Sequence, residues 1–288
     1  MRFLRIGPAG AERPALLHAV DTDVAYDLSA VTPDIDGAFL AGLTPARRAD
    51  LSARAEAGEF PRLPLADARV GAPVARPGKV VCIGLNYSDH AAETGQAIPA
   101  EPVVFMKASD TVVGPYDEVL IPRGSAKTDW EVELAIVIGA RTRYLASVED
   151  ADAVIAGYSI TNDVSEREWQ LERGGTWDKG KSCETFNPMG PWLVTSDEVP
   201  DPQSLGLRLR VNGETRQDGT TANMIFDVRY VVWYLSQFMV LEPGDVVNTG
   251  TPAGVAMGTP GQPWLQPGDV MDVEIDGLGA QRLPVGKA

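Results

Sequence analysis

The stretch that decides the fold is Asp129-Trp130-Glu131-Val132-Glu133-Leu134-Ala135-Ile136-Val137-Ile138-Gly139. β-Branched and aromatic residues dominate it and Gly139 closes it, which predicts a β-strand. Successive side chains point to opposite faces of a strand, so the even-numbered residues from 130 to 138 share one apolar face. Glu131 and Glu133 then project together from the other face. Two adjacent carboxylates repel each other and resist burial, and a bound cation would remove both problems. A strand edge whose acidic face is simply hydrated is the alternative.

A third carboxylate stands at the end of a second apolar run, at residues 155–163. This run is expected to be a strand that ends at Asp163, and strand ends are where rigid scaffolds present reactive groups. A polar segment that we expect to be helical follows at residues 165–170. Asp163 could therefore also be an ordinary N-cap of that helix.

Histidine is scarce, with only His18 and His90 in the chain. His18 lies in an apolar N-terminal segment, where a structural role is expected. His90 follows a glycine-led loop and enters a helical turn in which Glu93, three residues later, faces the same side. Such a carboxylate orients the imidazole and raises its basicity, as a general base requires, although His/Glu pairs also occur by chance on surfaces.

The scarcity of histidine and cysteine decides the class of metal. Zinc sites are built from His and Cys, which this chain hardly offers. Carboxylate ligands alone favour a hard ion, Mg²⁺ or Mn²⁺, with Ca²⁺ as a further option. Because Mg²⁺ takes six oxygens, three protein ligands would leave room for the carboxylate and keto oxygens of a 2-oxo acid.

The composition predicts a globular protein of 288 residues, with 44% hydrophobic and 23% charged residues. No apolar run is long enough to span a bilayer, and the charged N-terminus lacks the core of a signal peptide. Cys82 and Cys183 do not form a disulfide framework, so reduced thiols and a cytoplasmic location are expected. The net charge of −15 argues against binding to nucleic acid.

Short apolar runs bounded by Gly, Pro and Asp predict a β-rich α+β protein with two units. Residues 1–76 form a small N-terminal domain with a proline-rich linker, and residues 77–288 form the main domain. Thr44 is expected to cap a helix that begins with Pro45. The predicted strands are 3–6, 15–20, 24–28, 207–211 and 271–276, with a hairpin turn at Asn212-Gly213 and helices at 45–57 and 228–240.

Seven motifs, in order between residues 79 and 280, resemble the fumarylacetoacetate hydrolase superfamily. They are Gly84-Leu85-Asn86-Tyr87-x-x-His90-x-x-Glu93, Phe105-Met106-Lys107, Asp129-Trp130-Glu131-x-Glu133, Asn162-Asp163-Val164-Ser165, Lys179-Gly180-Lys181-Ser182, Gly190-Pro191-Trp192 and Asn248-Thr249-Gly250-Thr251-Pro252-x-Gly254. Each motif is common alone, but seven in order are specific.

This resemblance implies a mixed β-sandwich roll and a homodimer. It implies that Glu131, Glu133 and Asp163 hold Mg²⁺ or Mn²⁺. It also implies that the His90/Glu93 pair sits on a mobile lid and that Lys181 lies beside the metal. The candidate substrate-binding residues are Thr251, Lys107, Arg167, Gln170 and Tyr87.

The resemblance further implies an acylpyruvate type of reaction on a small oxo-acid substrate. The metal would chelate C1 and C2 of a 2,4-dioxo acid, and His90 would activate the water that attacks C4, so that the C3–C4 bond breaks and pyruvate leaves. Lys181 is the candidate oxyanion stabiliser.

The substrate is the least specified part of the prediction. Residues 127–130 and 165–181 are similar to bacterial enzymes that act on 2,4-diketo-3-deoxy-L-fuconate or L-rhamnonate and release lactate. Cys183 departs from these relatives, which often have Phe there. The alternatives are an oxaloacetate decarboxylase or other acylpyruvase, a ureidoglycolate lyase, and a catalytically idle binding member of the fold.

Overall fold

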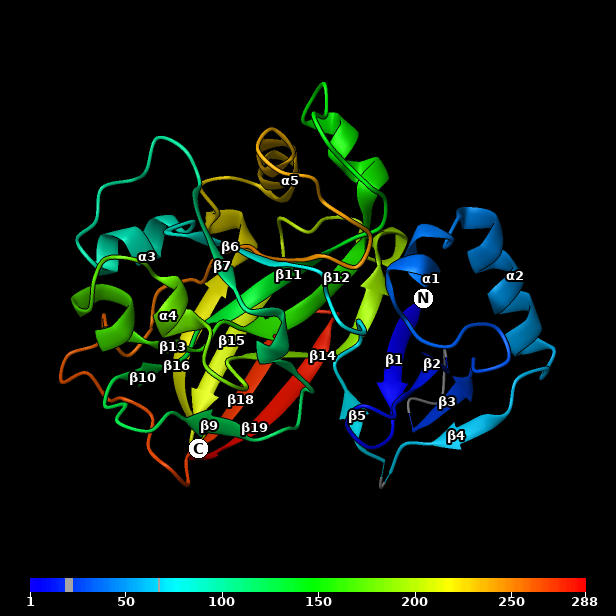
Figure 1. Ribbon diagram of the computed structural model, residues 1–288, viewed down its shortest axis with the longest axis horizontal. Helices are drawn as coiled ribbons and strands as arrows, with labels where there is room; N and C mark the ends of the chain where they lie inside the picture. The colour runs from blue at the N-terminus through cyan, green and yellow to red at the C-terminus, as the bar shows by residue number, and fades with distance from the viewer. Residues whose placement is uncertain (19–22, 67) are drawn as a thin grey trace.

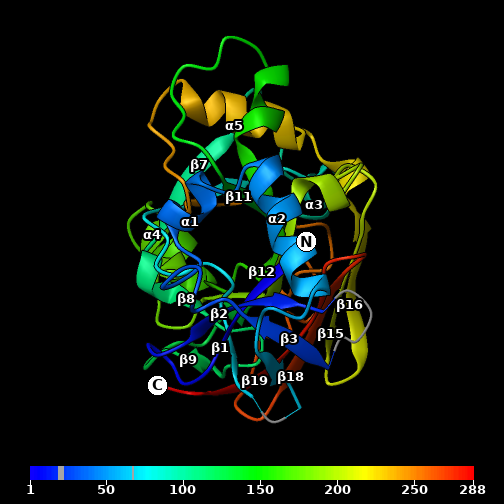
Figure 2. The same ribbon diagram turned by 90° about the vertical axis from the view of Figure 1, so that its right-hand side faces the viewer.

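The computed structural model describes residues 1–18, 23–66 and 68–288. Its strands form a large sheet, a five-stranded sheet and a two-stranded ribbon, and short helices cover the edges (Figures 1 and 2). Most strand pairs are antiparallel. Three are parallel: β17 (Val246–Asn248) with β6 (Val80–Gly84), β19 (Gly279–Lys287) with β9 (Val119–Ile121), and β14 (Asn187–Thr195) with β8 (Val112–Val113). The expected β-rich, mixed α+β architecture is confirmed.

The large sheet runs through the whole molecule. In spatial order its strands are β4 (Arg62–Pro64), β3 (Val24–Asp27), β2 (Arg13–Leu17), β1 (Arg2–Ile6), β14 (Asn187–Thr195), β12 (Ile155–Asn162), β11 (Val132–Ile138), β17 (Val246–Asn248), β6 (Val80–Gly84) and β7 (Val103–Lys107). In addition, β5 (Val70–Gly71) pairs with β1, and β8 (Val112–Val113) pairs with β14.

The smaller sheet has the order β16 (Glu214–Thr220), β15 (Gly206–Val211), β18 (Val270–Ile275), β19 (Gly279–Lys287) and β9 (Val119–Ile121), and the ribbon joins β10 (Thr128–Asp129) to β13 (Ser165–Glu166). The helices are α1 (Gly37–Ala41), α2 (Pro45–Glu56), α3 (Ser88–Glu93), α4 (Asp178–Lys181) and α5 (Val228–Ser236). Shorter turns are the 3₁₀ helices η1 (Ser109–Thr111), η2 (Glu149–Val154), η4 (Ser196–Glu198) and η5 (Thr221–Asn223) and the π-helix η3 (Glu168–Glu172).

The stretch at residues 129–138 is two strands and not one. β10 ends at Asp129 and β11 begins at Val132, so the expectation of one continuous strand is wrong. The physical reason lies in the neighbouring strand, because the amide of Glu131 donates to the side-chain oxygen of Asn162 at 2.9 Å. Glu131 therefore lies in the gap between the two strands, with its amide bonded to a side chain.

The two faces of β11 separate as the alternation predicted. Val132, Leu134, Ile136 and Ile138 pack in the main core, which includes residues of β15, β18 and β19. Ala135 and Val137, on the face that Glu133 shares, pack in a second core with side chains of the N-terminal unit. The large sheet is therefore buried on both sides, and Glu133 projects from its inner strand.

The N-terminal unit continues the large sheet, because β1 pairs antiparallel with β14 (Figure 1). Its helix α2 begins at Pro45, and the hydroxyl of Thr44 accepts a hydrogen bond from the amide of Arg47 at 3.2 Å, which confirms the predicted cap. The strand predicted at 15–20 is β2, which ends at Leu17. Residues 19 and 20 lie outside the described part of the chain.

Other predicted elements have shifted bounds. The hairpin between β15 and β16 turns at Asn212 and Gly213, which both have positive φ angles of 53° and 80°, as a two-residue hairpin turn requires. Helix α5 ends at Ser236, before the predicted residue 240. The segment 165–170, expected to be helical, begins instead as strand β13 and only then becomes helix η3.

Neither cysteine is paired: Cys82 is buried and Cys183 is half-buried. Among the described residues, no helix combines the length and apolar character needed to cross a membrane.

Candidate active site

Three acidic side chains meet where β11 and β12 run side by side. The strands pair with Glu133 opposite Thr161, and the amide of Asp163 donates to the carbonyl of Glu131 at 2.8 Å. Oxygen atoms of Glu131, Glu133 and Asp163 lie within 4.8 Å of one another, and all three side chains are buried. The helix-cap role considered for Asp163 is not observed, because its carboxylate contacts two lysines.

Three buried cations surround these carboxylates. Lys181 places its Nζ 2.7 Å from Glu131 and 2.9 Å from Asp163. Lys107 pairs with the other oxygen of Asp163 and donates to the carbonyl of Val164 at 3.0 Å. The Nη2 of Arg167 lies 2.6 Å from Glu131. Burying these charges is tolerable only because each one has a partner of opposite sign.

The electrostatic environments of the two glutamates are opposite. Burial opposes ionisation of Glu131, but Lys181 and Arg167 outweigh it and lower its pKa to about 2. Burial, together with the charges of Asp163 and Glu131, raises the pKa of Glu133 well above its ordinary value. The pKa of Lys181 is raised despite burial, because Asp163 and Glu131 stabilise its charge. Among the described residues, no cation forms an ion pair with Glu133, and the more distant charge of Lys181 does not offset burial.

A divalent cation fits this arrangement. All three donors are carboxylate oxygens, the ligand type that Mg²⁺ and Mn²⁺ prefer. Glu131, Glu133 and Asp163 would hold the ion, since their oxygens lie within 4.8 Å of one another. An ion would also supply the positive charge that Glu133 lacks.

Helix α3 carries the histidine–glutamate pair. His90 Nδ1 lies 3.2 Å from Oε2 of Glu93, and Oε1 of Glu93 accepts a hydrogen bond from the amide of Gly254 at 2.9 Å. A Cβ atom at Gly258 would lie 2.4 Å from Cδ of Glu93, so only glycine lets this carboxylate sit where it does. Both acceptor oxygens of Glu93 are thus used to fix its position, and one of them fixes the imidazole.

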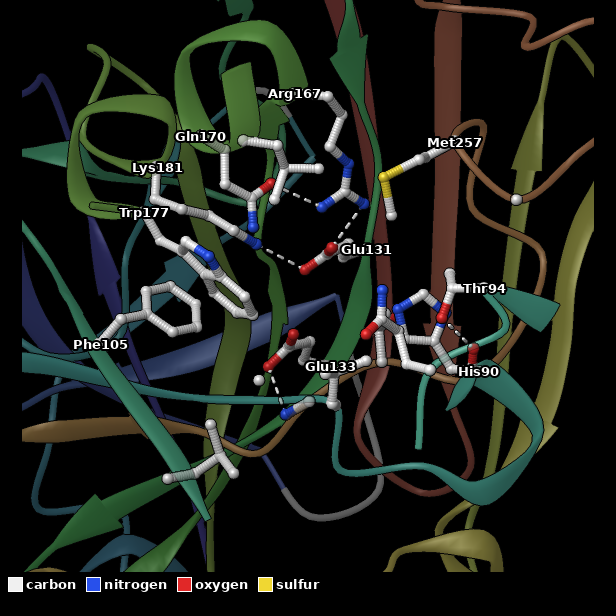
Figure 3. A pocket seen from close by; sticks show the side chains of 18 of the residues that line it. His90, Thr94, Phe105, Glu131, Glu133, Arg167, Gln170, Trp177, Lys181 and Met257 are labelled. Carbon is white, nitrogen blue, oxygen red and sulfur yellow. Dashed lines mark hydrogen bonds and ion pairs between the residues drawn. The ribbon is translucent and has the colours of Figure 1, made fainter. Parts of the chain in front are cut away.

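The histidine–glutamate pair, Glu131 and Glu133 share one cavity of about 350 Å³ (Figure 3). Eight of the candidate residues named from the sequence line it: His90, Glu93, Glu131, Glu133, Arg167, Gln170, Lys181 and Thr251. The hydroxyl of Thr251 donates to the carbonyl of Val132 at 2.9 Å. Three candidates do not line the cavity. Asp163 and Lys107 are buried and pair with each other, and Tyr87 is fully buried with no hydrogen-bond partner for its hydroxyl among the described residues.

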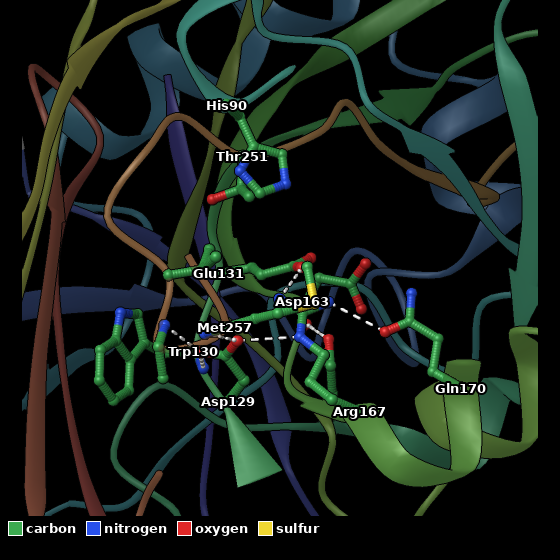
Figure 4. A network of polar contacts seen from close by, with 12 residues as sticks. His90, Asp129, Trp130, Glu131, Asp163, Arg167, Gln170, Thr251 and Met257 are labelled. Atoms are coloured by element: carbon green, nitrogen blue, oxygen red, sulfur yellow. Dashed lines mark hydrogen bonds and ion pairs between the residues drawn. The ribbon is translucent and has the colours of Figure 1, made fainter. Parts of the chain in front are cut away.

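Asp129 is a functional residue that the sequence reasoning missed. Its carboxylate is fully buried and accepts four hydrogen bonds (Figure 4). The donors are the amides of Trp130, Ala256 and Met257 and Nε of Arg167, at 2.7–3.1 Å. Arg167 also donates to the side-chain oxygen of Gln170 at 2.9 Å. Asp129 therefore links the backbone of the cavity wall at Met257 to Arg167, which contacts Glu131.

Helix α4 positions Lys181 beside the carboxylates because Gly180 packs closely against residues of η3 and β13. A Cβ atom at Gly180 would lie 2.5 Å from the amide nitrogen of Gln170 and 2.6 Å from the carbonyl oxygen of Glu166. Helices α4 and η3 can therefore pack tightly, which sets Lys181 and Gln170 side by side (Figure 3).

The family model described as fumarylacetoacetate (FAA) hydrolase C-terminal matches residues 79–286. The chain belongs to the fumarylacetoacetate hydrolase family. A Burkholderia ambifaria relative named "Putative hydrolase" is 51% identical over 98% of this chain and 97% of its own. The match and these geometries make the chain an enzyme of the hydrolase and isomerase type.

Two solved structures of this family resemble the whole chain. The maleylpyruvate hydrolase from Sphingobium sp. SYK-6, in complex with manganese(II) and pyruvate, is 29% identical with a TM-score of 0.82, and 100% of each chain is covered. The 2-hydroxyhepta-2,4-diene-1,7-dioate isomerase from Mycobacterium marinum is 35% identical with a TM-score of 0.78, covering 100% of this chain and 98% of its own. The fumarylacetoacetate hydrolase family thus includes both hydrolytic and isomerising members.

Proposed function

We propose that this enzyme is a divalent-metal-dependent hydrolase that cleaves the C3–C4 bond of a 2,4-dioxo acid to pyruvate and a small hydroxy acid. The observation that carries the proposal is the shared cavity: a histidine–glutamate pair borders the same space as Glu131 and Glu133. Hydrolysis needs a base for water beside a site that holds an oxo acid, and this cavity offers both.

Glu131, Glu133 and Asp163 would hold the ion, Mg²⁺ by preference and Mn²⁺ as a second choice. When bound, the ion supplies Lewis-acid chemistry that draws electron density from the carboxylate and 2-oxo oxygens of the substrate. The manganese and pyruvate bound to the Sphingobium maleylpyruvate hydrolase support this assignment.

His90 is the proposed general base. It takes a proton from a water molecule whose oxygen attacks C4, and Glu93 stabilises the imidazolium through the contact to Nδ1. The C3–C4 bond then breaks with its electron pair going to C3. A proton returned to C3 completes the methyl group of pyruvate, and the acyl group leaves as a carboxylic acid.

The other candidate residues hold the substrate or the ligands. Lys181, with its ammonium beside Glu131 and Asp163, is the proposed partner of the substrate oxygen that becomes negative. Arg167, Gln170 and Thr251 are proposed to contact the substrate, since they line the cavity.

Two of the earlier candidates fit a supporting role better. Lys107 is proposed to hold Asp163 in place and not to contact the substrate, because it pairs with Asp163 and does not line the cavity. Tyr87 is proposed to support the loop that leads to His90, since it is fully buried and does not line the cavity.

A 2,4-diketo-3-deoxy sugar acid of the L-rhamnonate or L-fuconate type is the proposed substrate, which would give lactate as the second product. Its support is the similarity of residues 127–130 and 165–181 to enzymes of that kind. Oxaloacetate decarboxylation uses the same ion and lysine without a base for water, so His90→Ala should lose hydrolysis and retain any decarboxylation.

The test is pyruvate release from acetylpyruvate and from the two sugar-derived diketo acids, measured with purified enzyme in Mg²⁺, in Mn²⁺ and in EDTA. We expect release that depends on the metal and on His90. No metal-dependent release from any dioxo acid or oxaloacetate would contradict the proposal and favour an idle binding protein.

A further inference from the structure

The positively charged side chains that line the cavity already pair with carboxylates of the protein. Arg167 and Lys181 are the only lysine or arginine side chains among the lining residues that the structure describes. Each lies within 2.7 Å of Glu131, and Arg167 also contacts Asp129. Lys181 is also assigned to the reacting oxygen of the substrate, so neither side chain is left unpaired for a second carboxylate at the distal end.

The formal charges of the buried site also indicate that it has no positive charge for a second substrate carboxylate. The four buried carboxylates of Asp129, Glu131, Glu133 and Asp163 face the three buried cations of Lys107, Arg167 and Lys181. Apart from the His90/Glu93 pair, which adds no net positive charge, this leaves one negative charge, which a divalent ion would turn into one positive charge. One substrate carboxylate then neutralises the site, while a second would be buried without a partner, at high cost.

Two basic side chains near the cavity, Arg173 and Lys127, pair with glutamates, and a third, Lys179, points to an exposed loop. Arg173 lies over the ring of Trp169 and pairs with Glu168 at 3.8 Å. Lys127 pairs with Glu172. Lys179 is exposed, and its Nζ lies against the loop at Gly174, where a Cβ atom would be 3.3 Å away. None of these residues lines the cavity.

The rest of the cavity carries an apolar wall, formed by Leu85, Phe105, Leu171, Trp177 and Met257. Phe105 and Trp177 pack edge to face with ring centroids 5.2 Å apart, beside Lys181 in Figure 3. Trp177 also lies on Gly84, where a Cβ atom would be 2.4 Å from its ring. This wall suits a carbon chain or ring and offers no charged partner.

We propose that the distal part of the substrate is uncharged: the enzyme takes monocarboxylic dioxo acids whose acyl end contacts the apolar wall, and it rejects dicarboxylic ones. This inference rests on the proposed function, because it places the single carboxylate at the metal. It separates this enzyme from its structural neighbour named for a 1,7-dioate. A deoxy sugar acid that ends in a methyl group satisfies it.

The test compares two unreactive ligands of equal length, 2-oxopentanoate and 2-oxoglutarate, which differ only in a terminal methyl or carboxylate. Isothermal titration calorimetry of the Mg²⁺-loaded protein measures binding without turnover. We expect 2-oxoglutarate to bind at least tenfold more weakly. Equal or tighter binding of 2-oxoglutarate would overturn the inference.

A pair of variants at Leu171 makes the same test from the protein side. Leu171 belongs to the apolar wall but is 47% exposed, so a polar replacement should not disturb the fold. Leu171→Arg supplies a free cation and should improve the affinity for 2-oxoglutarate relative to 2-oxopentanoate at least tenfold. Leu171→Gln, the uncharged control, should not. An equal effect of both variants would contradict the charge argument.

The two proposals fail in different ways. If acetylpyruvate is hydrolysed but the two ligands bind equally, only the uncharged distal group is overturned. If neither ligand binds in the presence of Mg²⁺ and no dioxo acid is cleaved, the proposed function is overturned and the inference falls with it.

Discussion

Replacing Glu133 with Gln separates metal binding from the rest of the site. Glu133 is 1% exposed, and its Oε2 accepts a hydrogen bond from the amide of Gly250 at 2.7 Å. Glutamine has the same shape and keeps an acceptor for Gly250, but it gives up the negative charge that a divalent ion requires. We expect an intact fold that no longer binds metal or releases pyruvate.

The metal-free proteins should differ in how stability depends on pH. Burial and the charges of Asp163 and Glu131 raise the pKa of Glu133 well above 4.5, so the folded state keeps this proton longer than the unfolded state. The stability from this group is fully present below pH 4.5 and is lost as pH rises through the raised pKa. The slope is at most about 1.4 kcal/mol per pH unit. The glutamine side chain of the Glu133→Gln variant does not titrate, so in EDTA the variant should gain stability relative to wild type as pH rises.

The effect of the metal can be estimated in the same units. An ion at 100 times its Kd stabilises the folded protein by about 2.7 kcal/mol. For 288 residues the unfolding entropy is about 0.6 kcal/mol/K, at about 2.1 cal/mol/K per residue. Mg²⁺ should therefore raise the Tm of the wild type by about 4 °C and that of Glu133→Gln by less than about 1 °C.

The assay is scanning calorimetry in EDTA and in Mg²⁺ between pH 5 and pH 8, with pyruvate release measured on the same samples. Glu274→Gln is the matched control, since it removes one charge from a side chain that is 45% exposed in the smaller sheet. Two results would refute the reasoning. One is a full Mg²⁺-dependent rise in the Tm of Glu133→Gln. The other is a variant that, in EDTA, loses stability relative to wild type as pH rises.

Three further predictions concern the supporting residues and the assembly. Asp129→Asn removes the charge that pairs with buried Arg167, so we expect about 3 kcal/mol lower stability by calorimetry and about tenfold weaker Mg²⁺ binding; unchanged Mg²⁺ affinity would rule out a positioning role. Gly258→Ala should displace the flexible end of Glu93, lowering kcat about 100-fold while the Kd for Mg²⁺ stays the same; a kcat within twofold of wild type would show that this glutamate need not be fixed. The family resemblance predicts a homodimer, so light scattering should give twice the chain mass of 30.8 kDa, and a monomer at micromolar concentration would show that prediction to be wrong.

The strand pattern was predictable because it depends on local periodicity. The two faces of β11 could be assigned from the alternation alone. Glu131 lies before this strand, yet it lines the same cavity as Glu133. The break before Val132 could not be predicted, because it depends on the side chain of Asn162 in another strand. Long-range partners decide where a strand is interrupted.

The candidate site shows the same division. The acidic residues were found through residue type and the family motifs, and the structure brings their oxygens within 4.8 Å. Asp129 was in the first stretch quoted, yet its importance depends on amides at Ala256 and Met257, more than 120 residues away. The signal that could have revealed it is a carboxylate at the head of a strand too apolar to expose it.

The apolar wall could not be predicted from the sequence. Phe105, Trp177 and Met257 come from three distant segments, and nothing in their spacing relates them. Only the packing of α4 against β7 brings two of these rings into contact. Substrate selectivity therefore depends on long-range packing that the sequence alone does not reveal.

The central claim is that Glu131, Glu133 and Asp163 bind one divalent ion. A crystal of the enzyme soaked in Mn²⁺, with data collected to reveal its anomalous scattering, tests it most directly. The account predicts one strong peak about 2.2 Å from an oxygen of each of the three carboxylates. A peak elsewhere, or none while Lys107 and Lys181 keep their contacts to Asp163, would contradict it.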